Sequence, residues 1–159
     1  MELQQILTEE MGSIVMDLIA KYESLGMRAS GRWAAGLRVD VQGQGSRFVG
    51  KIEGEDYTYY MQHGRASGRM PPVKAIEEWI QAKGIRPLEK KISVSSLAYA
   101  IAHKIGQEGT RRFKAGGKPE FIDDVITAER IQGIIDRVGE GYAVQFSSDI
   151  IKVIEEMAA

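Results

Sequence analysis

Apolar residues recur at steps of three and four through the first part of the chain, at Leu3, Leu7, Met11, Ile14, Leu18, Tyr22 and Leu25. This spacing places them along one side of a helix. We therefore predict an amphipathic helix over residues 2–26, which Gly26 ends. A coiled-coil seam has the same spacing, but the sequence lacks regular flanking charge pairs, and this favours one face of a globular core.

The period of the pattern changes to two from Arg32 onward. Leu37, Val39 and Val41 alternate with polar residues, and a second run covers residues 47–53 after a Gly-Gln-Gly turn. These features predict a β-hairpin. The aromatic run over residues 57–61 suits a third strand, so we expect an antiparallel β-meander with one face available to the first helix.

Helical spacing returns in the second half. Pro71-Pro72 can start a helix that ends at Gly84, and Ser93, Ser95 or Ser96 can cap a helix that reaches Gly109 or Phe113. We expect further helices over residues 121–138 and around residues 150–154. Gly139 and Gly141 should interrupt them, with a short extended piece at residues 142–146. The expected fold class is α+β: an N-terminal long helix, a small antiparallel β-meander, then three or four helices packed on the sheet, as a single domain over residues 1–159.

Composition adds limits and one pattern. Apolar residues make up 43% and charged residues 27% of the 159, which is typical of soluble globular domains. We expect no membrane span and no secretion signal, and the lack of cysteine excludes disulfides, thiolate zinc sites and cysteine nucleophiles. Charge is segregated: residues 1–27, 28–118 and 119–159 carry net charges of -4, +9 and -6. Unlike faces of this kind favour oriented contact within the fold or between copies.

Residues that could carry chemistry are few. His63 lies in a polar glycine-rich loop without a nucleophile or carboxylate nearby in sequence, and His103 lies on an expected helix surface. Neighbouring acids point apart on a helix and do not chelate, and no glycine motif matches a phosphate-binding loop. We therefore expect no catalytic, metal or cofactor site. Three basic groups could contact subunits or a nucleic-acid backbone, or simply be solvated. They are Arg65 with Arg69, Arg86 with Lys90 and Lys91, and Arg111 with Arg112, Lys114 and Lys118.

The run Tyr59-Tyr60-Met61-Gln62-His63-Gly64-Arg65 is followed by Gly68, Met70-Pro71-Pro72, Trp79-Ile80 and Lys83-Gly84-Ile85, and later by Leu97-Ala98, Ile101-Ala102 and Gly109-Thr110. This ordered set resembles tail-completion proteins of tailed bacteriophages, which join head and tail at the neck. The resemblance covers about residues 55–113. It extends to the first helix and hairpin by order alone, and the acidic C-terminal part departs from it.

The resemblance implies a non-enzymatic virion subunit, assembled in the host cytoplasm into a homo-oligomeric ring of commonly six or twelve copies around the DNA channel. Its implied partners are copies of itself, neighbouring connector, portal-adaptor or tail proteins, and genomic DNA through non-specific contact. The implied structural residues are Pro71, Pro72 and Trp79. Our candidates for subunit contact or the DNA channel are His63, Gly64, Arg65, Gly68, Arg69, Arg111, Arg112, Lys114 and Lys118.

Other functions stay open at this point. The chain could occupy another virion position, such as the tail terminator or a minor capsid or tail site. It could also be a small nucleic-acid-binding protein that uses its basic middle segment, or a small phage enzyme if the fold brings a carboxylate beside His63.

Overall fold

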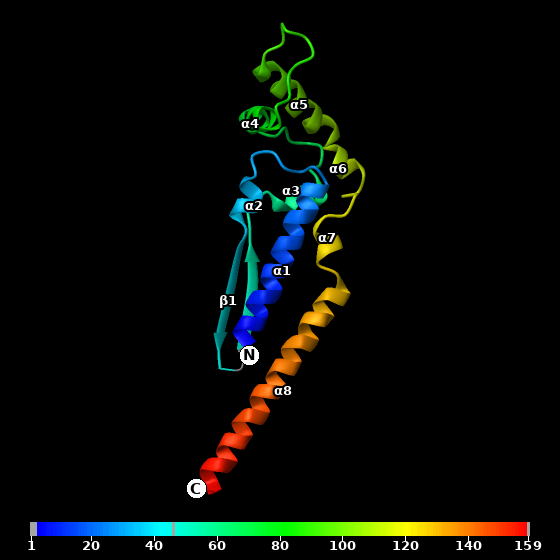
Figure 1. Cartoon of the computed structure of the whole chain (residues 1–159). Coiled ribbons are helices and arrows are strands. Elements are labelled where there is room, and N and C mark those ends of the chain that lie inside the picture. Colours follow the sequence, from blue (N-terminus) through cyan, green and yellow to red (C-terminus); the bar gives the residue numbers. More distant parts are fainter. Residues whose placement is uncertain (1–2, 46, 159) are drawn as a thin grey trace. The chain divides into compact units, whose positions relative to one another are not determined.

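The computed structural model describes residues 3–45 and 47–158 (Figure 1). It confirms an α+β fold with a long N-terminal helix, a two-stranded antiparallel sheet and several further helices. The elements are α1 (Leu3–Ser24), α2 (Arg32–Gly36), β1 (Arg38–Gln44), β2 (Arg47–Glu53), α3 (Thr58–His63), α4 (Val73–Lys83), α5 (Val94–Glu108), α6 (Arg111–Lys114), α7 (Ile122–Val125) and α8 (Ala128–Ala158).

Two compact units make up the chain, and we describe each by itself. The first unit comprises Met1–Asp17, Arg38–Glu53 and Asp123–Ala159, so it contains the start of α1, the hairpin and α8. The second unit comprises Leu18–Leu37 and Gly54–Ile122, which include α2 to α6.

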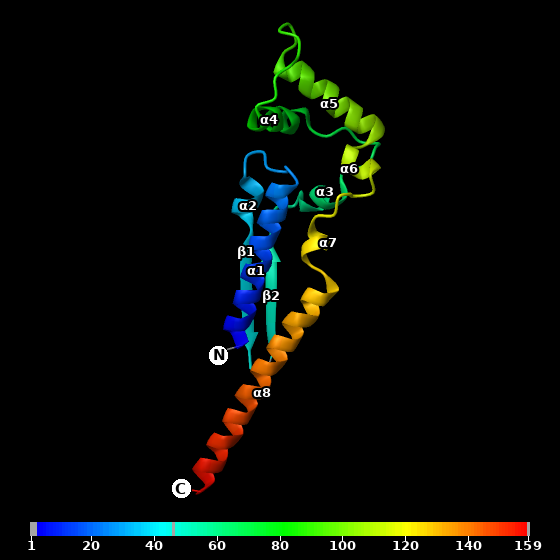
Figure 2. The same cartoon turned by 45° about the vertical axis from the view of Figure 1, so that its right-hand side comes forward.

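In the first unit, β1 and β2 pair antiparallel from Arg38 opposite Glu53 to Gln44 opposite Arg47 (Figure 2). Gly43 lies opposite Phe48, and a Cβ atom at Gly43 would overlap the Phe48 ring. The missing side chain therefore lets this ring lie across β1. Phe48 also makes an edge contact with Tyr142 of α8, at 6.4 Å between ring centroids.

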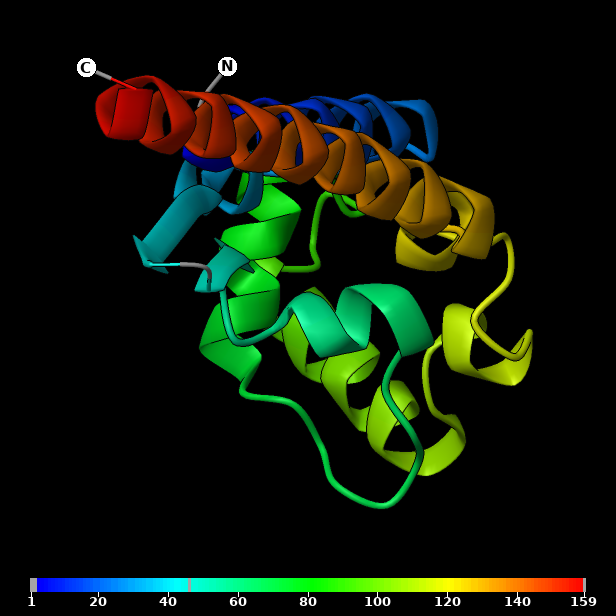
Figure 3. The ribbon, with the colours of Figure 1, turned by 90° about the horizontal axis from the view of Figure 1, so that it is seen from below.

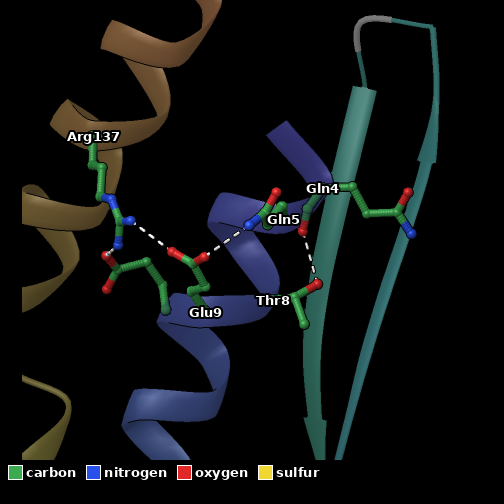
Figure 4. A network of polar contacts seen from close by, with 6 residues as sticks. Gln4, Gln5, Thr8, Glu9 and Arg137 are labelled. Atoms are coloured by element: carbon green, nitrogen blue, oxygen red, sulfur yellow. Dashed lines mark hydrogen bonds and ion pairs between the residues drawn. The ribbon is translucent and has the colours of Figure 1, made fainter. Parts of the chain in front are cut away.

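Helix α8 runs antiparallel along the part of α1 that belongs to the first unit (Figure 3). Arg130 forms an ion pair with Asp17 at 2.7 Å, and the Arg137 guanidinium donates to Glu10 and Glu9 at 2.6 and 2.7 Å (Figure 4). The hydrogen bond to Glu10 and, to a smaller extent, that to Glu9 raise the pKa of the Arg137 guanidinium. Charged pairs therefore join α8 to α1 at these positions.

The second unit has an aromatic core. Trp33 is buried between Tyr22 and Phe121, with ring centroids 4.9 and 5.3 Å away, and its Nε1 donates to Thr58 Oγ1 at 2.9 Å. Helices α4 and α5 pack against each other through side chains that include Ile80, Ala98 and Ala102, all at 0% exposure. The two alanines bring the helix backbones close together, as their small size predicts.

Several predicted boundaries are confirmed. Ser93 caps α5 and accepts from the Ser96 backbone N–H at 3.0 Å, and Gly84 ends α4 in the left-handed conformation, with φ of 67°. In α1, Leu3, Ile14, Leu18 and Tyr22 are buried as predicted, with Ile6 beside them. The other predicted core positions of this helix, Leu7, Met11 and Leu25, are only half-buried.

The predicted third strand is wrong, because residues 58–63 form α3. Tyr57 and Met61 line the same pocket while Tyr59 and Tyr60 are exposed, so the spacing of inward side chains is four and not two. Burial against the aromatic core thus overrides the strand preference of this run. Residues 32–36, expected to begin the hairpin, form α2 instead and carry the buried Trp33.

Two further expectations about the C-terminal part are wrong. Helix α8 continues through Gly139 and Gly141 and through the expected extended piece at residues 142–146, because an internal glycine costs a helix only about 1 kcal/mol. The later helices also do not all pack on the sheet. Of these later helices, α8 contacts the hairpin through Tyr142 and Phe48, whereas α3 to α6 belong to the second unit.

Candidate assembly surfaces

The loop between α3 and α4 is held in place by hydrogen bonds. Arg65 N donates to Thr110 Oγ1 at 2.9 Å, and Thr110 N donates back to Arg65 O at the same distance. Further along, Gly68 N donates to Gly106 O at 2.7 Å. The loop is therefore anchored to the end of α5 by its own backbone.

Two glycines make this anchoring sterically feasible. Gly64 has a φ of 76°, and a Cβ atom there would overlap the backbone N of Phe113 and lie 2.8 Å from its Cα. Gly109 has a φ of 78°, and its Cβ would lie 2.9 Å from Arg65 O. Both positions therefore need glycine for conformation and for space. Gly64 is thus a structural residue, whatever its role in subunit contact.

His63 is exposed at the end of α3, with its ring centroid 4.5 Å from that of Tyr59. Within residues 3–45 and 47–158, no carboxylate forms a hydrogen bond or ion pair with it. The same residues contain no group of three or more His, Asp or Glu side chains arranged to hold a metal ion. His63 is therefore a surface residue whose ring contacts that of Tyr59.

The candidates at the end of α5 and in α6 divide by environment. Arg111 is exposed, while Lys114 pairs with Glu108 at 3.0 Å and Lys118 pairs with Glu120. The hydrogen bond from Lys114, together with the charge of Lys104, lowers the pKa of Glu108. Two of the predicted contact lysines thus already have acidic partners on the surface.

Arg112 is a cross-link inside the second unit. Its Nε donates to Gln62 O at 2.9 Å and its Nη2 to Pro119 O at 2.6 Å, and burial lowers the pKa of its guanidinium. The Gln62 side chain in turn accepts from Ile122 N at 2.7 Å. Sequence reasoning missed Gln62, Thr110 and this role of Arg112, because nothing in the local pattern separates one arginine of an Arg-Arg pair from the other.

A groove of about 640 Å³ runs along the anchored loop, lined by Tyr60, Arg65, Ala66, Ser67, Arg69, Met70, Pro71, Pro72 and Val73. The Arg65 guanidinium lies over the Tyr60 ring at 5.3 Å. Tyr60 and Met70 are 48% and 39% exposed, so apolar surface and positive charge lie side by side. We call this feature the Arg65–Arg69 groove.

A second hollow of about 420 Å³ opens beside the aromatic core, where Tyr57, Met61 and Trp79 line it. Lys83 lies at its edge and donates from Nζ to Gly26 O at 2.6 Å. This lysine closes the turn after α1, so its charge serves the fold.

The last part of α8, residues 143–158, is exposed at every position, and we call it the α8 extension. One row along it consists of Ala143, Phe146, Ile150, Val153 and Met157, and an adjacent row of Val144, Ser147, Ile151, Ile154 and Ala158. Both rows follow alternating steps of three and four, which is the spacing of helix-packing seams. The sequence contained this signal, but the expected break at residues 142–146 hid it.

Among the described residues, no helix combines the length and the apolar composition that crossing a bilayer requires. No protein-family model, no curated protein and no solved structure matches the chain.

Proposed function

We propose that the chain is a structural subunit of the head-to-tail connector, or neck, of a tailed bacteriophage. In this role it forms a homo-oligomeric ring that completes the head–tail junction and surrounds the DNA channel. Neighbouring connector, portal-adaptor or tail proteins are its other partners.

The resemblance to tail-completion proteins supports the phage assignment. The residues that carry it fall within the second unit, where the Gly64-Arg65 loop, the Pro-started helix with Trp79 and the alanine-lined α5 belong to one packed body. Separate segments that carry the resemblance are thus joined by direct contacts, such as that between Arg65 and Thr110.

The observation that carries an assembly role is the amount of bare apolar surface. Among the described residues, 20 large apolar side chains are exposed, whereas 11 apolar residues are buried. Nine of the exposed ones lie on α8, which has no buried residue along its 31 positions. Contiguous surface of this kind marks interaction sites, because a monomeric soluble protein rarely leaves it uncovered.

The test is genetic and structural, in the phage that encodes the chain. A stop codon early in its gene should leave filled heads and separate tails that do not join, and supplying the chain from a plasmid should restore complete particles. Cryo-electron microscopy of purified particles should place a ring of this chain at the neck. Normal infectious particles without the chain would refute the proposal, while a ring at the tail end or a capsid position would move it to another virion site.

Nucleic-acid binding is the second candidate function, favoured by the charge of the second unit. That unit holds 15 Lys and Arg against 8 Asp and Glu. A binder of several phosphates should lose affinity for duplex DNA steeply as salt rises. A filter-binding titration at two salt concentrations distinguishes this function from purely structural assembly.

A further inference from the structure

We infer that the α8 extension of one copy docks into the Arg65–Arg69 groove of the next copy. The inference rests on the proposed function, because it names the contact that joins neighbours in the ring. It commits to a second copy of this chain as the occupant of the groove.

The apolar side of the α8 extension is exposed within the first unit. Gly141 lies close against α1, where a Cβ atom would come within 2.7 Å of Ile6 and 3.0 Å of Leu3. Beyond it, α8 contributes Val144 and the polar residues Gln145, Ser148, Asp149 and Lys152 to the hollow that it forms with Leu3 and Phe48. Phe146, Val153 and Met157 are 66%, 54% and 83% exposed. The extension is therefore exposed on all sides, and its polar side is the one nearer to Leu3 and Phe48.

The charges of the two units are opposite. The first unit carries 6 Lys and Arg against 14 Asp and Glu, a net charge of -8, and the second unit carries +7. Within the extension, Lys152 lies 4.0 Å from Asp149, while Glu155 and Glu156 have no basic partner among the described residues. An acidic, apolar helix of this kind should bind a basic, apolar surface.

The Arg65–Arg69 groove is such a surface. Neither arginine has an acidic partner in the part of the chain that the structure describes, and the cation of Arg65 is stacked on Tyr60 instead. Met70, Pro71, Pro72 and Val73 supply the apolar wall. A groove that takes an amphipathic helix needs these two features, an apolar wall for the seam and fixed charges for orientation.

The contact is heterologous, because one copy contributes the extension and the next contributes the groove. Every copy therefore has one free extension and one free groove, and a chain of such contacts ends when it closes into a ring. In the ring, the α8 extension and the Arg65–Arg69 groove of every copy each form one contact with a neighbour.

Charge reversal tests the contact. Variant A carries Arg65→Glu and Arg69→Glu, and variant B carries Glu155→Lys and Glu156→Lys. We expect each to associate at least about tenfold more weakly than the wild-type chain, by analytical ultracentrifugation, because two attractive pairs become repulsive. An equal mixture of A and B should regain association, since each extension then meets a groove of opposite charge. The matched control, Arg86→Glu with Lys90→Glu, makes the same charge change elsewhere on the second unit and should associate normally.

Circular dichroism of A and B should match the wild-type spectrum. If A is misfolded, the variant Arg65→Gln with Arg69→Gln replaces it. Variant B, in which the charge of the extension is reversed, still tests the contact by its own loss of association. Association of A and B equal to wild type, or no recovery in the mixture, overturns the inference. Cross-links between the extension and the groove of the same chain in a monomer also overturn it. The proposed function is tested separately, because it fails if particles form without the chain. If the ring in particles tolerates both variants, the proposed function survives and only the inferred contact fails.

Discussion

The space left by a single glycine decides how the basic loop is held. Gly64 allows the backbone of Phe113 to approach the α3 end, and the loop is then fixed by the paired hydrogen bonds of Arg65 and Thr110. A dense contact of this kind lies between segments about 45 residues apart in sequence. A side chain at Gly64 should therefore lower the stability of the whole second unit.

We predict that Gly64→Ala destabilises the protein by roughly 3 kcal/mol or more, because backbone strain adds to a backbone clash. Gly84→Ala is the matched control. Its φ is also positive, at 67°, but nothing lies within 4 Å of its Cβ position, so the cost should be only about 1 kcal/mol. Urea unfolding followed by tryptophan fluorescence measures both. Equal losses for the two variants would contradict the role given to the Phe113 contact.

Tyr22 makes the second unit sensitive to alkaline pH. Burial raises the pKa of its phenol above the ordinary value of 10.0. The unfolded chain then loses this proton at lower pH than the fold does, so the stabilisation is intact below about pH 10 and declines as pH rises further. We expect the wild-type melting temperature to fall more steeply above pH 10 than that of Tyr22→Phe. Parallel melting curves for the two proteins would argue against it.

The chemistry of individual residues could be predicted only in part. The sequence shows which residues are basic and where glycines lie, so the loop was found. It does not show that Arg112 donates to two backbone carbonyls, while Arg69 has no such partner among the residues that the structure describes. That difference comes from the path of residues 117–122, which no local pattern encodes.

At the scale of elements, the periods of three to four were the more reliable guide. The first helix, the two hairpin strands, α4 and α5 follow from spacing and caps, because each signal is complete within the element. Helix α3 and the continuous α8 were mispredicted where composition opposed spacing: tyrosines suggested a strand and glycines suggested a break. In both cases contacts from distant residues, with Trp33 near α3 and with Leu3 and Ile6 near α8, decide the outcome.

The two glycines of α8 should respond in opposite directions to the same change. Gly139 has nothing within 4 Å of its Cβ position, so Gly139→Ala should stabilise the first unit by up to about 1 kcal/mol through helix propensity. Gly141→Ala should lose that gain, because its methyl group meets Ile6 and Leu3. Thermal unfolding monitored by circular dichroism compares them. A larger gain at Gly141 would show that α8 does not pack closely on α1.

At the scale of the molecule, the residues that stabilise the fold differ from those that we propose for association. Contacts that hold α8 in place end near Tyr142, and the extension adds apolar surface with little packing inside its own unit. Removing it should therefore leave the units folded and change only what the chain binds.

We predict that a chain ending at Gln145 keeps its melting temperature within a few degrees and stays monomeric at concentrations where the full chain associates. Calorimetry and light scattering measure the two properties. A large drop in melting temperature would mean that the extension packs on its own chain. Unchanged association would place the subunit contact elsewhere.

The hydrogen bonds between the Arg65 loop and Thr110 exist before any neighbour arrives. Binding in the groove then freezes few additional backbone torsions, so little conformational entropy opposes it. Encounter should be governed by diffusion and by attraction between charges, and the loop need not rearrange first. In the proposed ring, subunits that bind in this way should join quickly even when each single contact is weak.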